Sequence, residues 1–262
     1  MNLRPPRPWE SCAICPARRL GLCAQLAAED IAALAEIKRN ARVVSAGSFL
    51  YRQDEPCHDY VIVLAGWVML RTALEDGSKH ILDFAVPGTF LGLHPAPGAL
   101  STHSAECLTS VTACLLARAR FDHLVSRNIT ICSRLAQLAA AHEARAQDHL
   151  ANIGGRDARG RVAHLMAELF FRVQRKFPPV AGDVISVPLS LEQIGQATSL
   201  TSVHVSRVLR RLREERVLSF RKPRLEILNS DALLKAAGFE GHLESWCEGS
   251  LPRSVPAERP IM

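Results

Sequence analysis

The sequence lacks the long apolar runs of a membrane protein and the apolar core of a signal peptide. None of its apolar runs approaches the roughly 18 residues that a membrane-spanning helix needs. The first residues, MNLRPPRPWESC, contain no apolar stretch of the kind found in signal peptides. We therefore expect a soluble, cytoplasmic protein, in which the eight cysteines are thiols, metal ligands or redox groups rather than a structural disulfide framework.

The sequence also lacks the patterns that are typical of an enzyme. It has no glycine-rich cofactor loop and no catalytic constellation. Four histidines are scattered without the spacing of metal ligands: His58, His80, His94 and His103. We expect no enzymatic activity.

Positive charge, by contrast, is in excess. The formal net charge of the 262 residues is +6 and the pI is near 9.1, which suits a polyanionic partner. Basicity alone does not distinguish nucleic acid from an anionic membrane surface, so the local pattern of residues must decide.

The stretch from Ser190 to Arg216 is typical of two helices joined by a tight turn. Ser190 and Gln193 have the spacing of a capping box, which predicts the start of a short first helix. Residues 199–201 form the predicted turn, and Thr201 or Ser202 can cap a second helix. Helical spacing turns the apolar side chains of this second helix inward: Val205, Val208, Leu209 and Leu212.

The second helix and the segment after it are strongly cationic. Between Thr201 and Arg224, Glu214 and Glu215 are outnumbered by Arg207, Arg210, Arg211, Arg213, Arg216, Arg221, Lys222 and Arg224. A helix fits the major groove of DNA, where arginine can contact guanine or a phosphate. We therefore predict a DNA-reading helix-turn-helix whose contacts are Ser202, His204, Ser206, Arg207, Arg210, Arg211, Arg221 and Lys222. A solvated, arginine-rich helix in another kind of bundle is the alternative.

Three cysteines near the N-terminus have the spacing C-x2-C-x7-C. Cys12 and Cys15 are placed so that both thiolates can reach one metal centre, and Pro16 stiffens the turn that aims them. With Cys23 they make an incomplete set, because a cubane cluster or a tetrahedral zinc ion needs a fourth ligand. The candidates for it are Cys57, Cys107, Cys114, Cys132 and Cys247. Ordinary thiols in a mobile arm are the alternative.

Between these two motifs the periodicity of the sequence changes twice. Residues 27–39 have helical spacing, whereas residues 41–118 contain short β-branched runs separated by turn residues, with a hairpin at Asp76-Gly77. Such strands predict a compact antiparallel barrel or roll. From Phe121 to about Asn152 the sequence has neither proline nor glycine and is helical again. We expect one long helix that ends at Gly154-Gly155.

The long helix is expected to pack against a parallel second copy of itself. Its predicted seam is Phe121, Val125, Asn128, Cys132, Leu135, Ala139, His142, Ala146 and His149. Packing against its own domain is the alternative, and the helix can do both. The expected domains are a cysteine arm (1–26), a β-roll sensor (27–120), the dimerisation helix (121–153), a winged helix-turn-helix (154–240) and a disordered tail (241–262). Within the winged helix-turn-helix we expect an edge strand at 184–189 and a wing at 217–228.

Cysteine arm, β-roll, long helix and winged helix-turn-helix, in this order, resemble the CRP/FNR family of bacterial transcription regulators, and within it the oxygen-sensing FNR branch. The resemblance implies an α+β fold with a cyclic-nucleotide-binding-like roll. It also implies a homodimer that binds near-palindromic double-stranded DNA and works with RNA polymerase. The cofactor it implies is an oxygen-sensitive [4Fe–4S] cluster on Cys12, Cys15, Cys23 and Cys114, with Cys107 as the rival fourth ligand.

The sequence departs from the family pattern at several positions. Cyclic-nucleotide binders have a Gly-Glu pair and an Arg-Ser/Thr-Ala motif, where this chain has Gly88-Thr89 and residues 103–105, His-Ser-Ala. Without the acidic and guanidinium groups we expect no cyclic nucleotide to bind. FNR-like proteins carry a glutamate three residues before their Ser-Arg pair, but Val203 stands there, before Ser206 and Arg207. We therefore expect an operator that differs from the usual FNR half-site at one position or tolerates more bases there.

Three other functions remain open from the sequence. The arm can bind zinc structurally in a constitutive DNA binder, or its cysteines can form a reversible disulfide switch. An iron–sulfur electron carrier is the third, more remote alternative.

Overall fold

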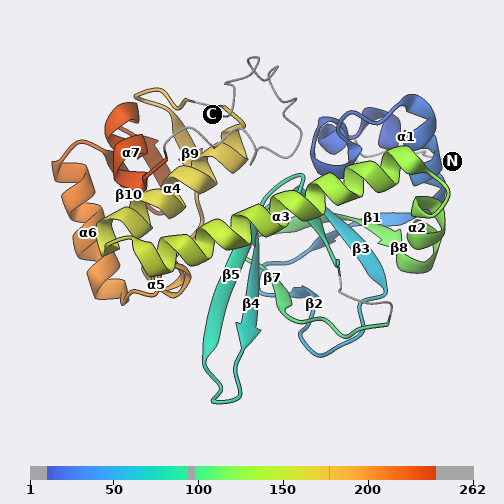
Figure 1. The fold of residues 1–262 in the computed structure, drawn as a ribbon, viewed down its shortest axis with the longest axis horizontal. Helices are drawn as coiled ribbons and strands as arrows, with labels where there is room; N and C mark the ends of the chain where they lie inside the picture. Colours follow the sequence, from blue (N-terminus) through green and yellow to red (C-terminus); the bar gives the residue numbers. More distant parts are fainter. Residues whose placement is uncertain (1–10, 94–97, 177, 240–262) are drawn as a thin grey trace, which may run out of the picture.

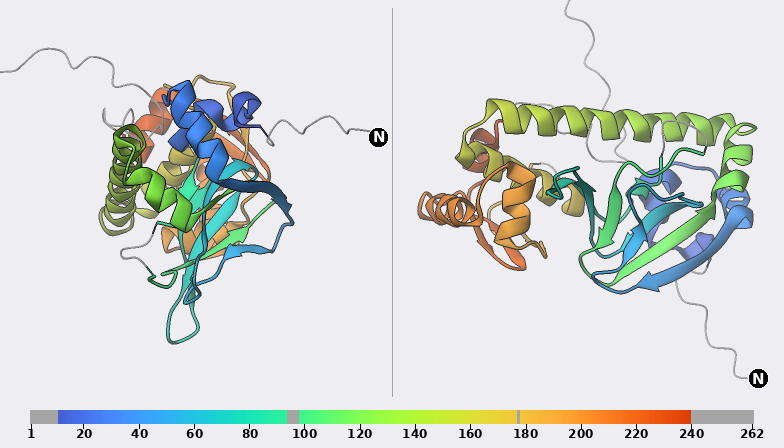
Figure 2. Two further views of the ribbon diagram at one scale, coloured as in Figure 1. Left: turned by 90° about the vertical axis from the view of Figure 1, so that its right-hand side faces the viewer. Right: turned by 90° about the horizontal axis from the view of Figure 1, so that it is seen from below.

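The computed structural model describes residues 11–93, 98–176 and 178–239. The predicted disordered tail and Cys247 lie outside these residues. The N-terminal half is a β-roll, the C-terminal part is a small helical domain with a three-stranded sheet, and one long helix, α3, lies along both of them (Figure 1). The views in Figure 2 show α3 running along one side of the two domains. Every helix among the described residues is too short or too polar to cross a membrane.

The arm consists of three short 3-10 helices that lead into an α-helix. These are η1 (Cys12–Ile14), η2 (Pro16–Arg19), η3 (Gly21–Cys23) and α1 (Ala28–Ile37). Arg18 holds the arm in shape because its guanidinium donates to the carbonyl oxygens of Cys23 at 2.7 Å and Leu26 at 2.6 Å. Leu22 and Leu26 are buried against the rest of the domain.

Eight strands form the predicted antiparallel roll from two four-stranded sheets. In chain order they are β1 (Lys38–Val44), β2 (Phe49–Tyr51), β3 (Asp59–Ala65), β4 (Val68–Ala73), β5 (Lys79–Ala85), β6 (Phe90–Leu91), β7 (Ser104–Cys107) and β8 (Val111–Ala117). The sheet orders are β1-β8-β3-β6 and β2-β7-β4-β5, with antiparallel pairing throughout. The turn at Asp76-Gly77 joins β4 to β5, which confirms the predicted hairpin.

The single helix predicted from Phe121 onward is wrong, because the chain forms two helices there. Helix α2 (Arg118–Val125) ends at Ser126, and α3 (Ile129–Gly155) starts afresh. Asn128 causes the restart, since its side chain caps α3 by accepting a hydrogen bond from the Ile131 amide at 2.9 Å and donates to Asp30 at 2.7 Å.

The predicted seam of α3 is also partly wrong. Of the predicted seam, Phe121 is buried within its own subunit and His149 bonds to another helix. Three other members of the predicted seam, Cys132, Ala139 and Ala146, are exposed. They belong to a stripe on the exposed side of α3 at steps of three and four: Ile129, Cys132, Ala136, Ala139, Glu143, Ala146, Leu150 and Ile153. The helix therefore packs on its own roll and still leaves a mainly apolar stripe outside.

The C-terminal domain has the predicted helix-turn-helix, edge strand and wing. It comprises α4 (Ala158–Gln174), β9 (Val184–Ser186), α5 (Leu191–Thr198), α6 (Ser202–Glu214), β10 (Leu218–Arg221), β11 (Arg224–Ile227) and α7 (Ser230–Ala237). Its sheet has the order β10-β11-β9, so β9 is an edge strand. One apolar cluster joins this domain to the roll, because Trp67, Met69 and Phe84 pack with α4 side chains such as Leu169 and Phe170.

Candidate DNA interface and cysteine centre

Local hydrogen bonds build the helix-turn-helix as predicted. The Ser190 hydroxyl accepts from the Gln193 amide at 3.1 Å, and the Gln193 side chain accepts from the Ser190 amide at 2.8 Å. Ser199 ends α5 with φ +56°, a left-handed conformation that glycine adopts at less cost. Thr201 then caps α6 by accepting from the His204 amide at 3.2 Å. These contacts define where α5 begins and ends and where α6 begins.

Helix α6 has one buried and one exposed face. Val205, Val208, Leu209 and Leu212 are buried, which confirms the predicted inward face. The predicted DNA contacts of α6 are all exposed to solvent: Ser202, His204, Ser206, Arg207, Arg210 and Arg211. Val203 is 59% exposed among them.

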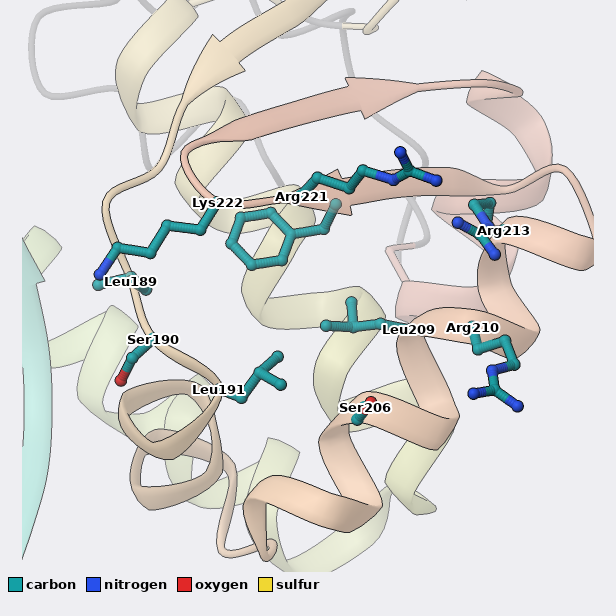
Figure 3. A pocket seen from close by; sticks show the side chains of 10 residues that line it. Leu189, Ser190, Leu191, Ser206, Leu209, Arg210, Arg213, Arg221 and Lys222 are labelled. Carbon is teal, nitrogen blue, oxygen red and sulfur yellow. The ribbon is translucent and has the colours of Figure 1, made fainter.

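A groove of about 500 Å³ lies between α6, the start of α5 and the wing (Figure 3). Leucines and Phe220 form its apolar part, while Ser206, Arg210 and Arg213 come from α6 and Arg221 and Lys222 from the wing. This arrangement places cations on both sides of a concave surface, where they can contact the phosphates of a DNA backbone. Arg213 was not among the predicted contacts, although it was counted in the charge of the segment.

Arg211 lies differently from the other predicted contacts. Its Nε donates to Glu215 at 2.7 Å, and Arg159 at the start of α4 also donates to Glu215, at 2.6 Å. Arg211 does not line the groove. The carboxylate of Glu215 thus compensates part of the charge on this side of α6.

Four of the candidate cysteine ligands gather at one end of the roll. Cys114 lies on β8 and belongs to the same packed cluster as Cys12 and Cys23 of the arm. The charges of Cys12, Cys15 and Cys23 each act on the pKa of Cys114. The fold therefore brings together side chains that are about 90 residues apart in sequence.

Burial controls the ionisation of these thiols. It raises the pKa of Cys23 to about 12 and that of Cys114 to about 12, and it raises the pKa of Cys12 in the same direction. The cation of Lys38 opposes the rise for all three thiols. Such thiols are neutral at pH 7 until a cationic centre binds and displaces their protons. The donor set, with cations beside it, fits a buried metal or cluster site.

Potential metal ligands come closest together away from the cysteines. Within the described part of the chain, Asp83, His149 and Glu168 form the single set of three potential ligand atoms that all lie within 4.8 Å of one another. No three cysteine sulfurs there are that close.

The rival cysteines lie elsewhere. Cys107 ends β7 in a separate cluster with Val61 and Val68, where burial raises its pKa to about 11 and the nearby charges are Arg42 and Glu106. Cys57 packs against that same cluster, and Cys132 is exposed on α3.

A cavity of about 200 Å³ lies between the roll and α3. Thr89 and His103 both line this cavity. They stand at the two places where the sequence departs from the pattern of cyclic-nucleotide binders. The His103 ring lies 2.8 Å from the Tyr51 hydroxyl, and Arg145, which also lines the cavity, lies 4.0 Å from Asp83. The volume is below the roughly 300 Å³ at which ligand pockets usually begin. The expectation that this protein does not bind cyclic nucleotides stays a prediction.

The sequence did not reveal a charged network that joins the roll, α3 and α4. Its members are Asp83, Arg145, His149, Glu168 and Arg172. Arg172 donates to Asp83 at 2.6 Å and to Glu168 at 3.0 Å, while His149 lies 2.7 Å from Glu168. The spacing of four between Glu168 and Arg172 on a predicted helix was the one visible sign of a pair.

The charges of this network stabilise one another. The Glu168 carboxylate raises the pKa of His149 to about 9. Burial opposes ionisation of Glu168, but His149 and Arg172 outweigh it and lower its pKa to about 2. Burial likewise opposes ionisation of Asp83, yet Arg172, Arg145 and His149 hold its pKa below the usual range. Because these cations already compensate the carboxylates, the trio of Asp83, His149 and Glu168 is an ion network rather than a metal site.

Comparison with known proteins agrees with this architecture. The family described as cyclic nucleotide-binding domain matches residues 41–128, and the Crp-like helix-turn-helix domain matches residues 160–236. The nitrogen fixation regulation protein FixK of Bradyrhizobium diazoefficiens is 30% identical over 203 residues, which are 77% of this chain and 83% of that protein. The transcriptional activator protein Anr of Pseudomonas aeruginosa is 25% identical over 237 residues, or 90% and 96% of the two chains.

The solved structure of FixK2 from Bradyrhizobium japonicum has the same fold. It superposes with a TM-score of 0.66 at 26% identity and covers 75% of this chain and 96% of that one. The α+β fold predicted from the sequence is therefore confirmed.

Proposed function

Because the chain belongs to the CRP/FNR family of DNA-binding transcription regulators, we propose that it controls transcription in response to oxygen or redox state. The thiols of Cys12, Cys15, Cys23 and Cys114 would hold a [4Fe–4S] cluster, which when bound supplies the oxygen-reactive centre. The observation that carries this proposal is the position of Cys114, on β8, among the three cysteines of the arm.

The donor set supports a metal or cluster site at this position. Four thiols gather at one partly buried end of the roll, and the cation of Lys38 opposes the rise in the pKa of three of them. The position of Cys107 in another cluster favours Cys114 as the fourth ligand.

The arm can act on dimerisation because it packs on the first half of α3. Leu22 and Leu26 share a buried cluster with Ile131 and Leu138, and Arg134 of α3 donates to the Gly21 carbonyl. Thiolate ligation from both the arm and β8 would hold the arm in this place. An ordered arm supports α3, and the exposed stripe of α3 is the surface on which a second copy would pack.

Pairing of two copies matters for DNA recognition. Two α6 helices held about one DNA turn apart can read a near-palindromic site in adjacent major grooves, while each wing contacts the backbone. A single copy forfeits half of these contacts, so a change in pairing changes operator occupancy. RNA polymerase is the expected protein partner at the promoter.

The test is anaerobic purification followed by iron, sulfide and zinc determination. We expect wild type and Cys107→Ser to contain equal iron and sulfide, and Cys114→Ser to have lost most of both. DNA binding of the wild type, measured by mobility shift, should weaken on exposure to air. Zinc in place of iron, or a cysteine disulfide after oxidation with no iron beforehand, would reject the cluster and identify the corresponding alternative.

A further inference from the structure

A tight turn of the roll lies between the cysteine arm and the DNA-binding domain. The turn, residues 86–89, follows β5. The Thr89 amide donates to the Val86 carbonyl at 3.0 Å, the Gly88 amide donates to the Val63 carbonyl at 2.8 Å, and the Val63 amide donates to the Thr89 carbonyl at 3.1 Å. These hydrogen bonds fasten the turn to β3.

The arm rests directly on one side of this turn. Gly21 has φ +50°, and a Cβ added there would overlap the carbonyl oxygen of Gly88. A Cβ added to Gly88 would in turn lie 2.9 Å from the Cβ of Leu20. Only two glycine backbones facing each other fit here, so the arm cannot shift inward without moving the turn.

The DNA-binding domain contacts the other side of the same turn. Arg175, which caps the C-terminus of α4, donates from Nη2 to the Pro87 carbonyl oxygen at 2.7 Å. Its backbone has φ +54°. This left-handed conformation costs energy in any residue other than glycine. One turn earlier on α4, Arg172 bonds to Asp83 of β5 at 2.6 Å. Arg172 of α4 and Arg175 directly after this helix thus bond to two nearby positions of the roll, Asp83 and Pro87.

We propose that the turn at residues 86–89 couples the cysteine arm to the DNA-binding domain within a single subunit, with Arg175 as the positioning residue. This inference rests on the proposed sensory role of the arm. An ordered arm presses on Gly88, the turn keeps its place, and Arg175 and Arg172 keep α4 docked on the roll. A loosened arm releases this contact and lets the DNA-binding domain change its angle, whether or not the two subunits separate.

The experiment perturbs the arm and measures the end of α4. Gly21→Ala pushes the arm away from Gly88, and hydrogen–deuterium exchange of residues 171–176 reports on docking. The variant is compared in three backgrounds: wild type, Arg175→Asn, which removes the guanidinium but tolerates the left-handed backbone, and Lys176→Asn. Lys176 is the matched control, because it pairs with Asp183 inside the DNA-binding domain at 3.1 Å. Native mass spectra ensure that only equal association states are compared.

We expect Gly21→Ala to raise exchange at residues 171–176 about fivefold in the wild-type and Lys176→Asn backgrounds. In the Arg175→Asn background exchange is already raised, and Gly21→Ala should add less than about twofold. Equal effects of Gly21→Ala in all three backgrounds would overturn the proposal, as would unchanged exchange in the wild-type background.

Coupling is reciprocal, so the arm must also respond to Arg175. Arg175→Asn should raise the alkylation rate of Cys23 in the apo protein, whereas Lys176→Asn should leave it unchanged. This second measurement does not depend on the folding of Gly21→Ala, and an unchanged rate in Arg175→Asn contradicts the coupling. Neither readout uses iron, so an iron-free protein would reject the cluster while the coupling could still be measured.

Discussion

Arg134 of α3 donates two hydrogen bonds to the carbonyl oxygen of Gly21, at 2.8 Å from Nη2 and 3.2 Å from Nε, across 113 residues of sequence. Arg134 is buried at this contact. A charged donor that meets a backbone carbonyl away from water makes a strong hydrogen bond. The arm is therefore attached both to the roll, through Gly88, and to the helix that carries the exposed stripe.

The first prediction concerns this contact. Arg134→Met keeps most of the apolar side chain but removes the donors, so it should lower the free energy of unfolding by about 1.5–3 kcal/mol and speed alkylation of Cys23. Urea denaturation and timed alkylation measure the two effects. The control is Arg127→Gln, a change at an exposed position near the start of α3, which should stay within about 0.5 kcal/mol.

The second prediction concerns the stripe on α3. Leu150 is 73% exposed in the single subunit, so Leu150→Glu should not disturb its folding. In a dimer it would place two buried like charges face to face, and the dimer dissociation constant should rise about 30-fold or more. Sedimentation velocity measures the change. An unaltered dimer with Leu150→Glu would show that the chains pair through another surface.

The third prediction uses Cys132 as a natural reporter of the same stripe. If two α3 helices pack in parallel and in register, their Cys132 thiols face each other. Each pair should then lose two protons and two electrons to a mild oxidant such as copper phenanthroline and form an intersubunit disulfide. Non-reducing electrophoresis should show a covalent dimer that Cys132→Ser lacks. Equal cross-linking in both proteins would contradict this packing.

The fourth prediction concerns pH. The raised pKa of His149, about 9 against 6.5 in the unfolded chain, means that its protonated form stabilises the fold. This contribution is complete below pH 6.5 and is lost as the pH rises through 9; it amounts to at most about 3 kcal/mol. Urea denaturation across this window should show a steeper loss of stability for wild type than for His149→Gln. Parallel curves would mean that His149 is not paired with Glu168 in solution.

The fifth prediction concerns DNA reading. Arg207→Ala should weaken operator binding by about 1–3 kcal/mol and relax the preference at one base pair. Lys222→Gln should weaken binding to all sequences alike and reduce the slope of affinity against salt by about one. Mobility shifts over a range of salt concentrations distinguish the two. Val203→Glu should shift the preferred base opposite that position, and selection from a randomised operator tests it.

The helix-turn-helix could be predicted closely because its determinants are local. The capping box of Ser190 and Gln193, the cap at Thr201 and the spacing of Val205 to Leu212 each act within one or two turns of chain. The arm cysteines are likewise recognisable because their ligand spacing lies within a dozen residues. Such short-range patterns need no knowledge of distant partners.

The remaining features depend on which distant residues meet. Cys107 and Cys114 are seven residues apart and equally plausible by composition, but β7 and β8 belong to different sheets, and of the two cysteines only Cys114 shares a cluster with the arm. Apolar residues on both sides of α3 satisfy the same helical period, so periodicity could not separate the side that packs on the roll from the exposed stripe. The contacts of Asp83 with Arg172 and of Pro87 with Arg175 each span almost 90 residues of sequence. Because only the folded chain brings these groups together, the sequence pattern could not indicate that they are partners.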